Sequence, residues 1–394
     1  MKFNEKKIIM LNITDKSKCN GCHACKNICP QNCINMEYDH EGFLYPSIFV
    51  DNCINCGLCE KICPVLNPRD IENHESIAFA CKNKDEAIRK ISSSGGIFSV
   101  IANSVLEKGG VIFGAAFDDE FKVIHKYVED FQSLQTLFGS KYVQSEIGTC
   151  YIQAKNFLEQ GRLVLFTGTP CQVGGLLSYL KKPYDNLITQ DIICHGVPSP
   201  IVWKKYLKFK LSKRKQKIKK VCFRSKINGW KRYSLQFTFD NEETDCKIQG
   251  NDPYMKAFFK SVSLRPSCFN CSFKSKNRNS DMTLADLWGI ENIAPEIDDN
   301  KGISLVILHS PKGKALFKKL KEKILFKEID LNLAIEFNPC MIRSVKRSPK
   351  REKFLLEINE NNFDKITQKY CKESVLFRMR RKLKSIKFFN LKRE

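Results

Sequence analysis

The chain has 394 residues, of which 42% are hydrophobic, and this is enough apolar material for two or three folded units and excludes a disordered protein. No run of about 18 apolar residues occurs, and Met1–Lys7 lacks the apolar core of a secretory signal, so neither a membrane span nor a leader is predicted. Lysine and arginine outnumber aspartate and glutamate by 66 to 43, and the net charge of +23 suits an anionic cofactor, an acidic partner, a membrane surface or nucleic acid.

The 19 cysteines point to metal chemistry rather than to disulfides. We expect the chain to be cytoplasmic, and a reducing compartment keeps thiols free. The odd total also argues against a fully paired disulfide framework. Cysteines that cluster in this sequence are therefore more easily explained as metal ligands.

The N-terminal region carries a repeated cysteine motif. The run Cys19-x2-Cys22-x2-Cys25-x3-Cys29-Pro30 returns 34 residues later as Cys53-x2-Cys56-x2-Cys59-x3-Cys63-Pro64. The two-residue gaps let three successive cysteines wrap one 4Fe-4S cubane, and the fourth cysteine of such a run ligates the other cluster. A doubled and ordered match makes a zinc site or a coincidence an improbable explanation.

This spacing predicts two 4Fe-4S clusters. The first takes Cys19, Cys22, Cys25 and Cys63, and the second takes Cys53, Cys56, Cys59 and Cys29. Cys33 is left without a role. Residues 1–68 resemble bacterial two-cluster ferredoxins, and between the repeats Ile34–Tyr38 and Phe43–Tyr45 flank the turn Asp39–Gly42, which predicts a β-hairpin that closes this small domain.

A polar, proline-bearing linker over residues 64–75 precedes a second unit. From Ser76 onward, strand-like and helical patterns alternate over Ile77–Ala80, Ile97–Leu106, Val111–Phe117, Tyr151–Leu158 and Leu163–Phe166. The predicted fold class is α+β. A ferredoxin-like domain over residues 1–68 is followed by a mixed α/β domain over residues 69–345 and by a basic, helical tail over residues 346–394.

Two glycine-bearing turns in the second domain have the form of ligand sites. Ser92–Gly96 precedes a helix that begins near Ile97, so hydroxyls and free amides gather where a phosphate can bind, although an ordinary helix N-cap explains the same residues. Thr167–Cys171 follows a strand and enters a helical stretch, which is where α/β folds usually bind ligands. Neither turn matches the nicotinamide-binding or P-loop glycine pattern.

Six motifs together resemble one family. They are Ser93–Gly96, Gly139–Tyr142, Thr167–Gln172, Asp191–Gly196, Cys268-x2-Cys271 and Asp281–Gly289. In this order they are similar to the beta subunit of coenzyme F420-reducing hydrogenase and its dehydrogenase relatives, a family of flavin iron-sulfur proteins. The resemblance implies FAD, a third 4Fe-4S cluster and, in the hydrogenase members, reduction of a deazaflavin. Nothing resembles a hydrogenase large subunit, so the chain alone is not expected to split hydrogen.

The resemblance also implies where FAD binds. The expected contacts are Ser93, Ser94, Gly95, Gly96, Lys141, Thr167, Gly168 and Thr169. Among them Gly95 would permit close approach of the backbone to the pyrophosphate, because glycine has no side chain. Asp286 and Trp288 are better explained as a capping or solvated charge and as a packing residue, and no residue is assigned a catalytic role.

Four cysteines are candidate ligands of the third cluster. Cys171 and Cys194 sit at turns that follow strands, and Cys268 and Cys271 share one loop. From spacing alone, this last pair could bind zinc with His195 or belong to an ordinary loop, and the family resemblance favours the cluster. Three other cysteines are explained as small buried hydrophobes, namely Cys81, Cys150 and Cys222.

The end of the chain is strongly basic. Leu376, Met379, Leu383 and Ile386 recur at helical spacing among arginines and lysines, which fits an amphipathic helix on an anionic membrane or on a partner. A solvated helix docked on its own domain explains the same pattern and is the commoner case. No nucleic-acid-reading motif accompanies the charge, so no nucleic-acid partner is expected. Peripheral contact with the inner face of the membrane remains a hypothesis for this tail.

Two functions are compatible with these features. In the first, the chain is a flavin-dependent oxidoreductase that passes electrons from a low-potential donor such as a ferredoxin, through 4Fe-4S clusters and FAD, to an organic acceptor, either F420 or another small molecule. In the second, the chain is a non-catalytic subunit that delivers electrons to a partner enzyme. The sequence names neither the acceptor nor the donor.

Overall fold

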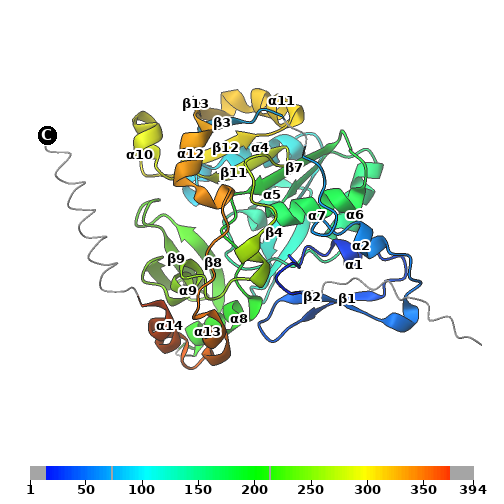
Figure 1. The fold of residues 1–394 in the computed structure, drawn as a ribbon. Coiled ribbons are helices and arrows are strands. Elements are labelled where there is room, and N and C mark those ends of the chain that lie inside the picture. Colours follow the sequence, from blue (N-terminus) through cyan, green and yellow to red (C-terminus); the bar gives the residue numbers. More distant parts are fainter. Residues whose placement is uncertain (1–14, 72–73, 213, 373–394) are drawn as a thin grey trace, which may run out of the picture.

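Residues 15–71, 74–212 and 214–372 are described by the computed structural model, in which an N-terminal module (residues 15–68) lies beside a larger domain built on two β-sheets (Figure 1). The predicted hairpin of the module is confirmed, since β1 (Ile34–Tyr38) pairs antiparallel with β2 (Leu44–Ile48). Its turn is closed by Asp39, whose Oδ1 accepts the amides of Glu41 and Phe43 at 3.0 and 2.9 Å. The module also contains α1 (Ala24–Ile28), η1 (Val50–Asn52) and α2 (Leu58–Lys61).

An eight-stranded sheet forms the centre of the larger domain, with the strand order β13-β3-β12-β11-β7-β6-β4-β5. Its strands are β3 (Ile77–Asn83), β4 (Val111–Phe117), β5 (Val123–Val128), β6 (Val164–Thr167), β7 (Leu187–Ile192), β11 (Met282–Asp286), β12 (Ser304–Leu308) and β13 (Ile324–Ile329). Strands β4, β6, β7 and β11 run parallel to one another, and the other four are antiparallel to their neighbours. The carboxyl ends of the four parallel strands therefore meet at one edge.

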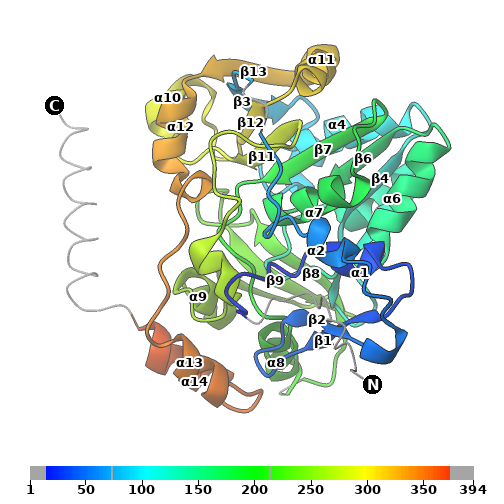
Figure 2. The ribbon, with the colours of Figure 1, turned by 45° about the vertical axis from the view of Figure 1, so that its right-hand side comes forward.

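Helices cover both faces of this sheet, because its strands direct alternate apolar side chains into two cores (Figure 2). On β4, for example, Ile112 enters one core and Val111 and Phe113 enter the other. The helices on the first face are α4 (Ile97–Leu106) and α11 (Pro311–Leu320), and those on the second are α6 (Cys150–Glu159), α7 (Pro170–Leu180), α10 (Ile290–Ile293) and α12 (Leu331–Phe337). The predicted mixed α/β fold is thus confirmed.

The shorter elements connect these layers. They are α3 (Glu86–Ile91), α5 (Phe131–Leu134), η2 (Gln135–Leu137), η3 (Pro266–Asn270), η4 (Pro295–Ile297), η5 (Lys321–Lys323) and η6 (Pro339–Met341). None of the helices in the described ranges combines the length and the hydropathy needed to cross a bilayer.

A second, antiparallel sheet has the strand order β10-β9-β8 and its own aromatic core. Its strands are β8 (Ile218–Ser225), β9 (Ser234–Phe239) and β10 (Thr244–Ile248), and the surrounding helices are α8 (Pro200–Leu211), α9 (Pro253–Phe259), α13 (Arg351–Glu357) and α14 (Phe363–Cys371). Phe354 and Phe363 of the last two helices are fully buried in this core, so the start of the basic C-terminal region packs on the domain. The predicted amphipathic segment from Leu376 to Ile386 lies outside the described residues.

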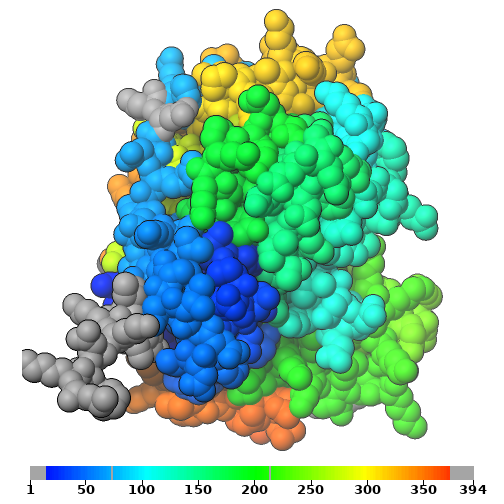
Figure 3. Space-filling view, turned by 90° about the vertical axis from the view of Figure 1, so that its right-hand side faces the viewer, coloured from blue at the N-terminus to red at the C-terminus, as the bar shows by residue number. Residues whose placement is uncertain are grey.

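The N-terminal module, blue in Figure 3, lies directly against the larger domain. Buried polar contacts hold it there as well as packing. The guanidinium of Arg351 on α13 forms an ion pair with Glu41 at the hairpin turn, and the Arg351 side chain is only 1% exposed. At the same turn, a Cβ on Gly42 would lie 2.4 Å from Ile201 of α8, so glycine permits the hairpin to sit directly on that helix. The hairpin is therefore docked in a fixed orientation.

Replacing Arg351 with methionine is expected to lower the free energy of unfolding by about 3 kcal/mol, because it leaves the Glu41 carboxylate buried and unpaired. The double variant Glu41→Gln/Arg351→Met should recover most of that loss. Arg347→Met, which breaks the exposed pair with Glu352, should cost less than about 1 kcal/mol. Urea unfolding of the anaerobically purified protein measures all three, and equal losses for Arg351→Met and Arg347→Met would contradict this account.

Candidate functional site

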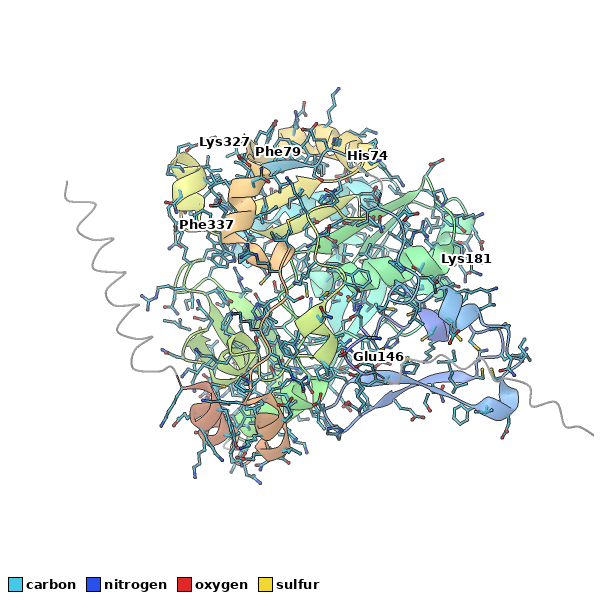
Figure 4. The ribbon with its side chains drawn as sticks, in the orientation of Figure 1. His74, Phe79, Glu146, Lys181, Lys327 and Phe337 are labelled. Carbon is cyan, nitrogen blue, oxygen red and sulfur yellow. The ribbon has the colours of Figure 1, made fainter. Side chains whose placement is uncertain are left out.

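A cavity of about 640 Å³ opens at the edge where the parallel strands end. Its walls include Ala115 of β4, Thr167 of β6, Gln190 of β7 and Asp286 of β11. Phe337 at the end of α12, labelled in Figure 4, also lines it. Open α/β sheets bind ligands at the carboxyl ends of parallel strands, and the volume lies in the range of cofactor and substrate sites. This cavity is the candidate functional site.

Most of the residues expected to contact FAD meet in this cavity. Ser93, Ser94, Gly96, Lys141, Thr167, Gly168 and Thr169 all line it. Two helices begin at its wall: α4 starts at Ile97, directly after the serine-glycine turn, and α7 starts at Pro170 behind a capping box formed by Thr169 and Gln172. The N-cap of α4 is Gly96, and no side chain caps this helix. The serines of the Ser92–Gly96 turn therefore do not act as an ordinary N-cap.

Gly95 is the exception among these residues. It does not line the cavity, and a Cβ placed on it would lie 2.4 Å from the Cys81 carbonyl oxygen of β3 and 2.7 Å from the Ser304 amide nitrogen of β12. Glycine is required here because the turn packs against the sheet. A bulky residue at this position would force the strands apart, so its effect on a cavity ligand would be indirect.

Lys141 brings a cation to the cavity wall. Its Nζ donates to the carbonyl oxygens of Thr136, Leu137, Phe138 and Gly139 at 2.9 to 3.3 Å, which holds the amine beside the end of η2. Burial lowers the pKa of Lys141 to about 7, so its charge depends on pH in the neutral range. An anionic ligand close to this amine would favour its protonated form.

Several buried polar atoms of the cavity residues have no partner within the described chain. Gln190 is 4% exposed, and neither its Oε1 nor the Oε1 of Gln249 accepts a hydrogen bond. The Nε of Arg224 and the Nε2 of His195 are also unpartnered. Unsatisfied buried polar groups are rare in native proteins because each costs free energy. These four atoms are enclosed by the protein itself, so they do not face the open part of the cavity.

Asp286 and Trp288 take part in one cluster at the cavity wall. Asp286 pairs with Arg224 at 2.7 Å and accepts the indole N–H of Trp230 at 2.9 Å, so it is neither a helix cap nor a solvated charge. Trp288 stacks on Trp230 with ring centroids 5.0 Å apart. Sequence reasoning missed Arg224, Gln190 and Gln249, because nothing in a strand pattern distinguishes a polar residue that faces a cavity from one that faces solvent.

The four cysteines proposed for a third cluster converge beside this cavity. Burial raises the pKa of Cys171 well above its usual value, and the neighbouring thiolates of Cys271, Cys194 and Cys268 raise it further. The backbone reaches these thiols as well, since the amide of Val197 lies 3.5 Å from the Cys268 sulfur. Cys194 also lines the cavity. Three segments that are far apart in the sequence thus contribute to one thiol group.

His195 does not complete a zinc site with this group. Its Nδ1 lies 3.5 Å from the sulfur of Cys340, a cysteine that sequence reasoning left unassigned, and Cys340 lines the cavity too. No three His, Cys, Asp or Glu side chains of the described chain lie close enough to hold a single metal ion. The four thiolates around a cubane lie farther from one another than the ligands of a single metal ion do.

The N-terminal module contains two further thiol groups. In the proximal group, burial raises the pKa of Cys22, and Cys25, Cys19 and Cys63 raise it further, which matches the predicted crossed ligand set. The distal group surrounds a small cavity lined by Cys29, Cys33, Cys53, Cys56 and Cys59. Cys33, left over by the motif, lies here with its sulfur 3.3 Å from that of Cys29. Cys56 is exposed, so the distal group reaches the surface.

Helix α7 connects the proximal thiols to those beside the cavity. A Cβ on Gly175 would lie 3.0 Å from the Cβ of Cys22 and 3.2 Å from its sulfur, so the glycine lets the module approach the helix closely. Cys171 is four residues earlier on α7, which is about 6 Å along the helix axis. Cys59 raises the pKa of Cys25, so the distal and proximal groups are also neighbours. The three thiol groups therefore follow one another from the surface to the cavity.

Comparison with known proteins agrees with this organisation. Residues 18–67 match the 4Fe-4S dicluster domain, and residues 161–333 match the C-terminal part of the coenzyme F420 hydrogenase/dehydrogenase beta subunit. The region of residues 161–333 therefore has the sequence of this beta subunit family. The N-terminal module is an iron-sulfur domain.

Two curated relatives match short stretches of the chain. Pyruvate synthase subunit PorD of Methanothermobacter marburgensis is 39% identical over 51 residues, which are 13% of this chain and 53% of that protein. The chain thus spans about half the length of this relative. Ferredoxin 7Fe of Hydrogenibacillus schlegelii is 38% identical over 64 residues, which are 16% of this chain and 76% of that protein.

Among solved structures, a chain from the F420-reducing NiFe hydrogenase complex of Methanosarcina barkeri is similar, with 16% identity and a TM-score of 0.46. The similarity covers 69% of this chain and 96% of that one.

Replacing Gly175 with valine is expected to lower the free energy of unfolding by about 1–3 kcal/mol, because the new side chain would overlap the Tyr151 hydroxyl and Cys22. The strain should also loosen the N-terminal module and speed proteolytic cleavage in the linker at residues 64–75. Gly250→Val is the matched control, since a Cβ there meets nothing within 4 Å. Cleavage rates that are the same in both variants would show that the module does not rest on α7.

Proposed function

We propose that the chain is an iron-sulfur flavoprotein oxidoreductase, which takes electrons from a low-potential donor such as a ferredoxin and delivers them to an organic acceptor, F420 or another small molecule. The observation that carries this proposal is the line of three thiol groups, which begins at the exposed Cys56, passes Cys22 and Cys171, and ends at the cavity. A structural iron-sulfur protein would need no such ordered path.

The proposed cluster ligands are the twelve cysteines of the three groups. They are Cys19, Cys22, Cys25 and Cys63 for the proximal cluster, Cys29, Cys53, Cys56 and Cys59 for the distal one, and Cys171, Cys194, Cys268 and Cys271 for the third. The donor chemistry supports this assignment. Burial raises the pKa values of Cys22, Cys25 and Cys268, so these thiols would lose their protons readily only when a metal binds the thiolates.

The proposed occupant of the cavity is FAD. When bound, FAD supplies the conversion between one-electron transfer and two-electron hydride transfer. The residues present suit it, because Ser93 and Lys141 at the cavity wall offer a hydroxyl and an ammonium to a diphosphate. The cavity volume of about 640 Å³ is of the size that large cofactors use.

The anaerobically purified chain is expected to contain about twelve iron atoms and one FAD, from three cubanes of four irons each. Replacing Cys268 and Cys271 by serine should lower the iron to about eight while the two N-terminal clusters keep their electron paramagnetic resonance (EPR) signals. Cys246→Ser on β10 is the control and should leave the iron unchanged. A double variant with twelve irons would disprove the third ligand set.

Lys141→Met is expected to weaken FAD binding, because it removes the cation proposed to face the diphosphate. The wild-type affinity should fall by up to about tenfold between pH 7 and pH 8, since an amine with a pKa of about 7 loses its charge in that range. The Lys141→Met variant should lose this pH dependence. Equilibrium dialysis of flavin-depleted protein measures both effects, with Lys155→Met as the surface control.

Steady-state turnover separates this function from the alternative of a non-catalytic subunit. The purified chain, given a chemical reductant, should reduce a small organic acceptor catalytically. If the reduced flavin were reoxidised only by a second protein, the chain would be an electron-delivery subunit.

A further inference from the structure

Arg265 is a fully buried cation at the junction of the N-terminal module and the cysteine loop of the larger domain. Its side chain enters the module, where Nε donates to the Cys19 carbonyl at 2.8 Å and Nη2 donates to the Leu44 carbonyl at 2.9 Å. Nη1 donates to Gln144 Oε1 at 2.9 Å, and Nη2 lies 3.6 Å from the Cys19 sulfur. Its own carbonyl accepts the amide of Cys268 at 3.0 Å.

Arg265 differs from the other buried arginines in having no carboxylate partner. Five arginines of the described chain are buried, and four of them form an ion pair: Arg89 with Asp299, Arg224 with Asp286, Arg278 with Asp191 and Arg351 with Glu41. The acceptors found for Arg265 within the described ranges are two carbonyls, one amide oxygen and one sulfur. A buried charge without a counter-charge is costly, so a negative group is expected beside it.

The proximal thiol group is the candidate for that negative group. Cys19 belongs to it, and a cubane with four thiolate ligands is an anion that gains another negative charge when it is reduced. The distal cavity offers a contrast, because its lining contains no lysine or arginine. We infer that Arg265 is the counter-charge of the proximal iron-sulfur cluster and raises its reduction potential. This inference rests on the cluster ligands proposed above.

The direction in which Arg265 shifts the reduction potential follows from electrostatics. A fixed cation favours the more negative, reduced form of a cluster, and net charge and hydrogen bonds to the sulfurs are among the factors that set its potential. Arg265 belongs to the larger domain, so the module acquires this charge only when it is docked. Docking would thereby make the proximal cluster a better electron acceptor. Arg265 is thus a positioning and tuning residue, not a catalytic one.

Two substitutions remove the net charge in different ways. Arg265→Gln deletes the cation, and Gln144→Glu keeps it but gives it a carboxylate at the position of the present amide oxygen. Arg265→Lys retains the charge and is the conservative variant. The double variant Glu41→Gln/Arg351→Met removes the buried ion pair of the same interface without changing its net charge and is the matched control.

Potentiometric EPR titration of the full-length chain, purified anaerobically, provides the test. Cys56→Ser identifies the distal signal and Cys19→Ser the proximal one. In both Arg265→Gln and Gln144→Glu, the proximal cluster should become harder to reduce. The equilibrium constant for electron transfer from the proximal to the distal cluster should therefore rise at least tenfold, which is about 59 mV for one electron. Arg265→Lys should shift it by less than half as much, and the control variant should leave it unchanged.

The outcomes are distinguishable. An unchanged proximal potential in Gln144→Glu, with wild-type iron content, would overturn the inference and leave the ligand assignment standing. If Arg265→Gln loses iron or fails to fold, Gln144→Glu decides alone. An equal shift in the control variant would show that the contacts of the docked interface, and not the charge of Arg265, set the potential of the proximal cluster. A proximal signal that survives Cys19→Ser would overturn the ligand assignment and this inference together.

Discussion

The close contact of Cys22 with Gly175 is the constraint on which the rest of the arrangement depends. Helix α7 is rigid, and its first turn lies at the edge where the parallel strands end. That turn contains Thr169 at the cavity wall and Cys171 among the thiols beside it. Because the module rests on the following turn, one helix determines how far the proximal thiols lie from the cavity. A side chain at position 175 would lengthen that separation.

The polarity of the docking surface is consistent with a fixed geometry. An apolar interface can slide with little change in free energy, whereas buried ion pairs and charge-assisted hydrogen bonds hold one register. Arg351 pairs with Glu41 at the hairpin turn, and Arg265 donates to the carbonyl of Cys19, the first cysteine of the motif. The two arginines come from segments on either side of the cysteine loop. Folding of the larger domain therefore prepares both contacts.

The local features of this protein could be predicted from its sequence. The repeat around Cys19 and Cys53 specifies iron-sulfur binding because ligand spacing within a loop is a property of contiguous residues. The hairpin over Ile34–Ile48 and the strand-turn-helix around Thr167 were predictable for the same reason, since turn residues and hydrophobic periodicity act over a few positions. The match of Cys171, Cys194, Cys268 and Cys271 came from resemblance to a family, because no periodicity joins residues a hundred positions apart.

The tertiary structure alone decided which polar groups face the cavity and which face the sheet. Gly95 packs against β3 and β12, while Gln190 and Arg224 line the cavity, and adjacent positions in the sequence give no sign of this division. The same holds for Arg265, whose acceptors among the described residues include the Cys19 and Leu44 carbonyls of the N-terminal module. The sequence determined the cofactor chemistry through local spacing, whereas the order of the thiol groups and their charges arose from contacts between distant segments.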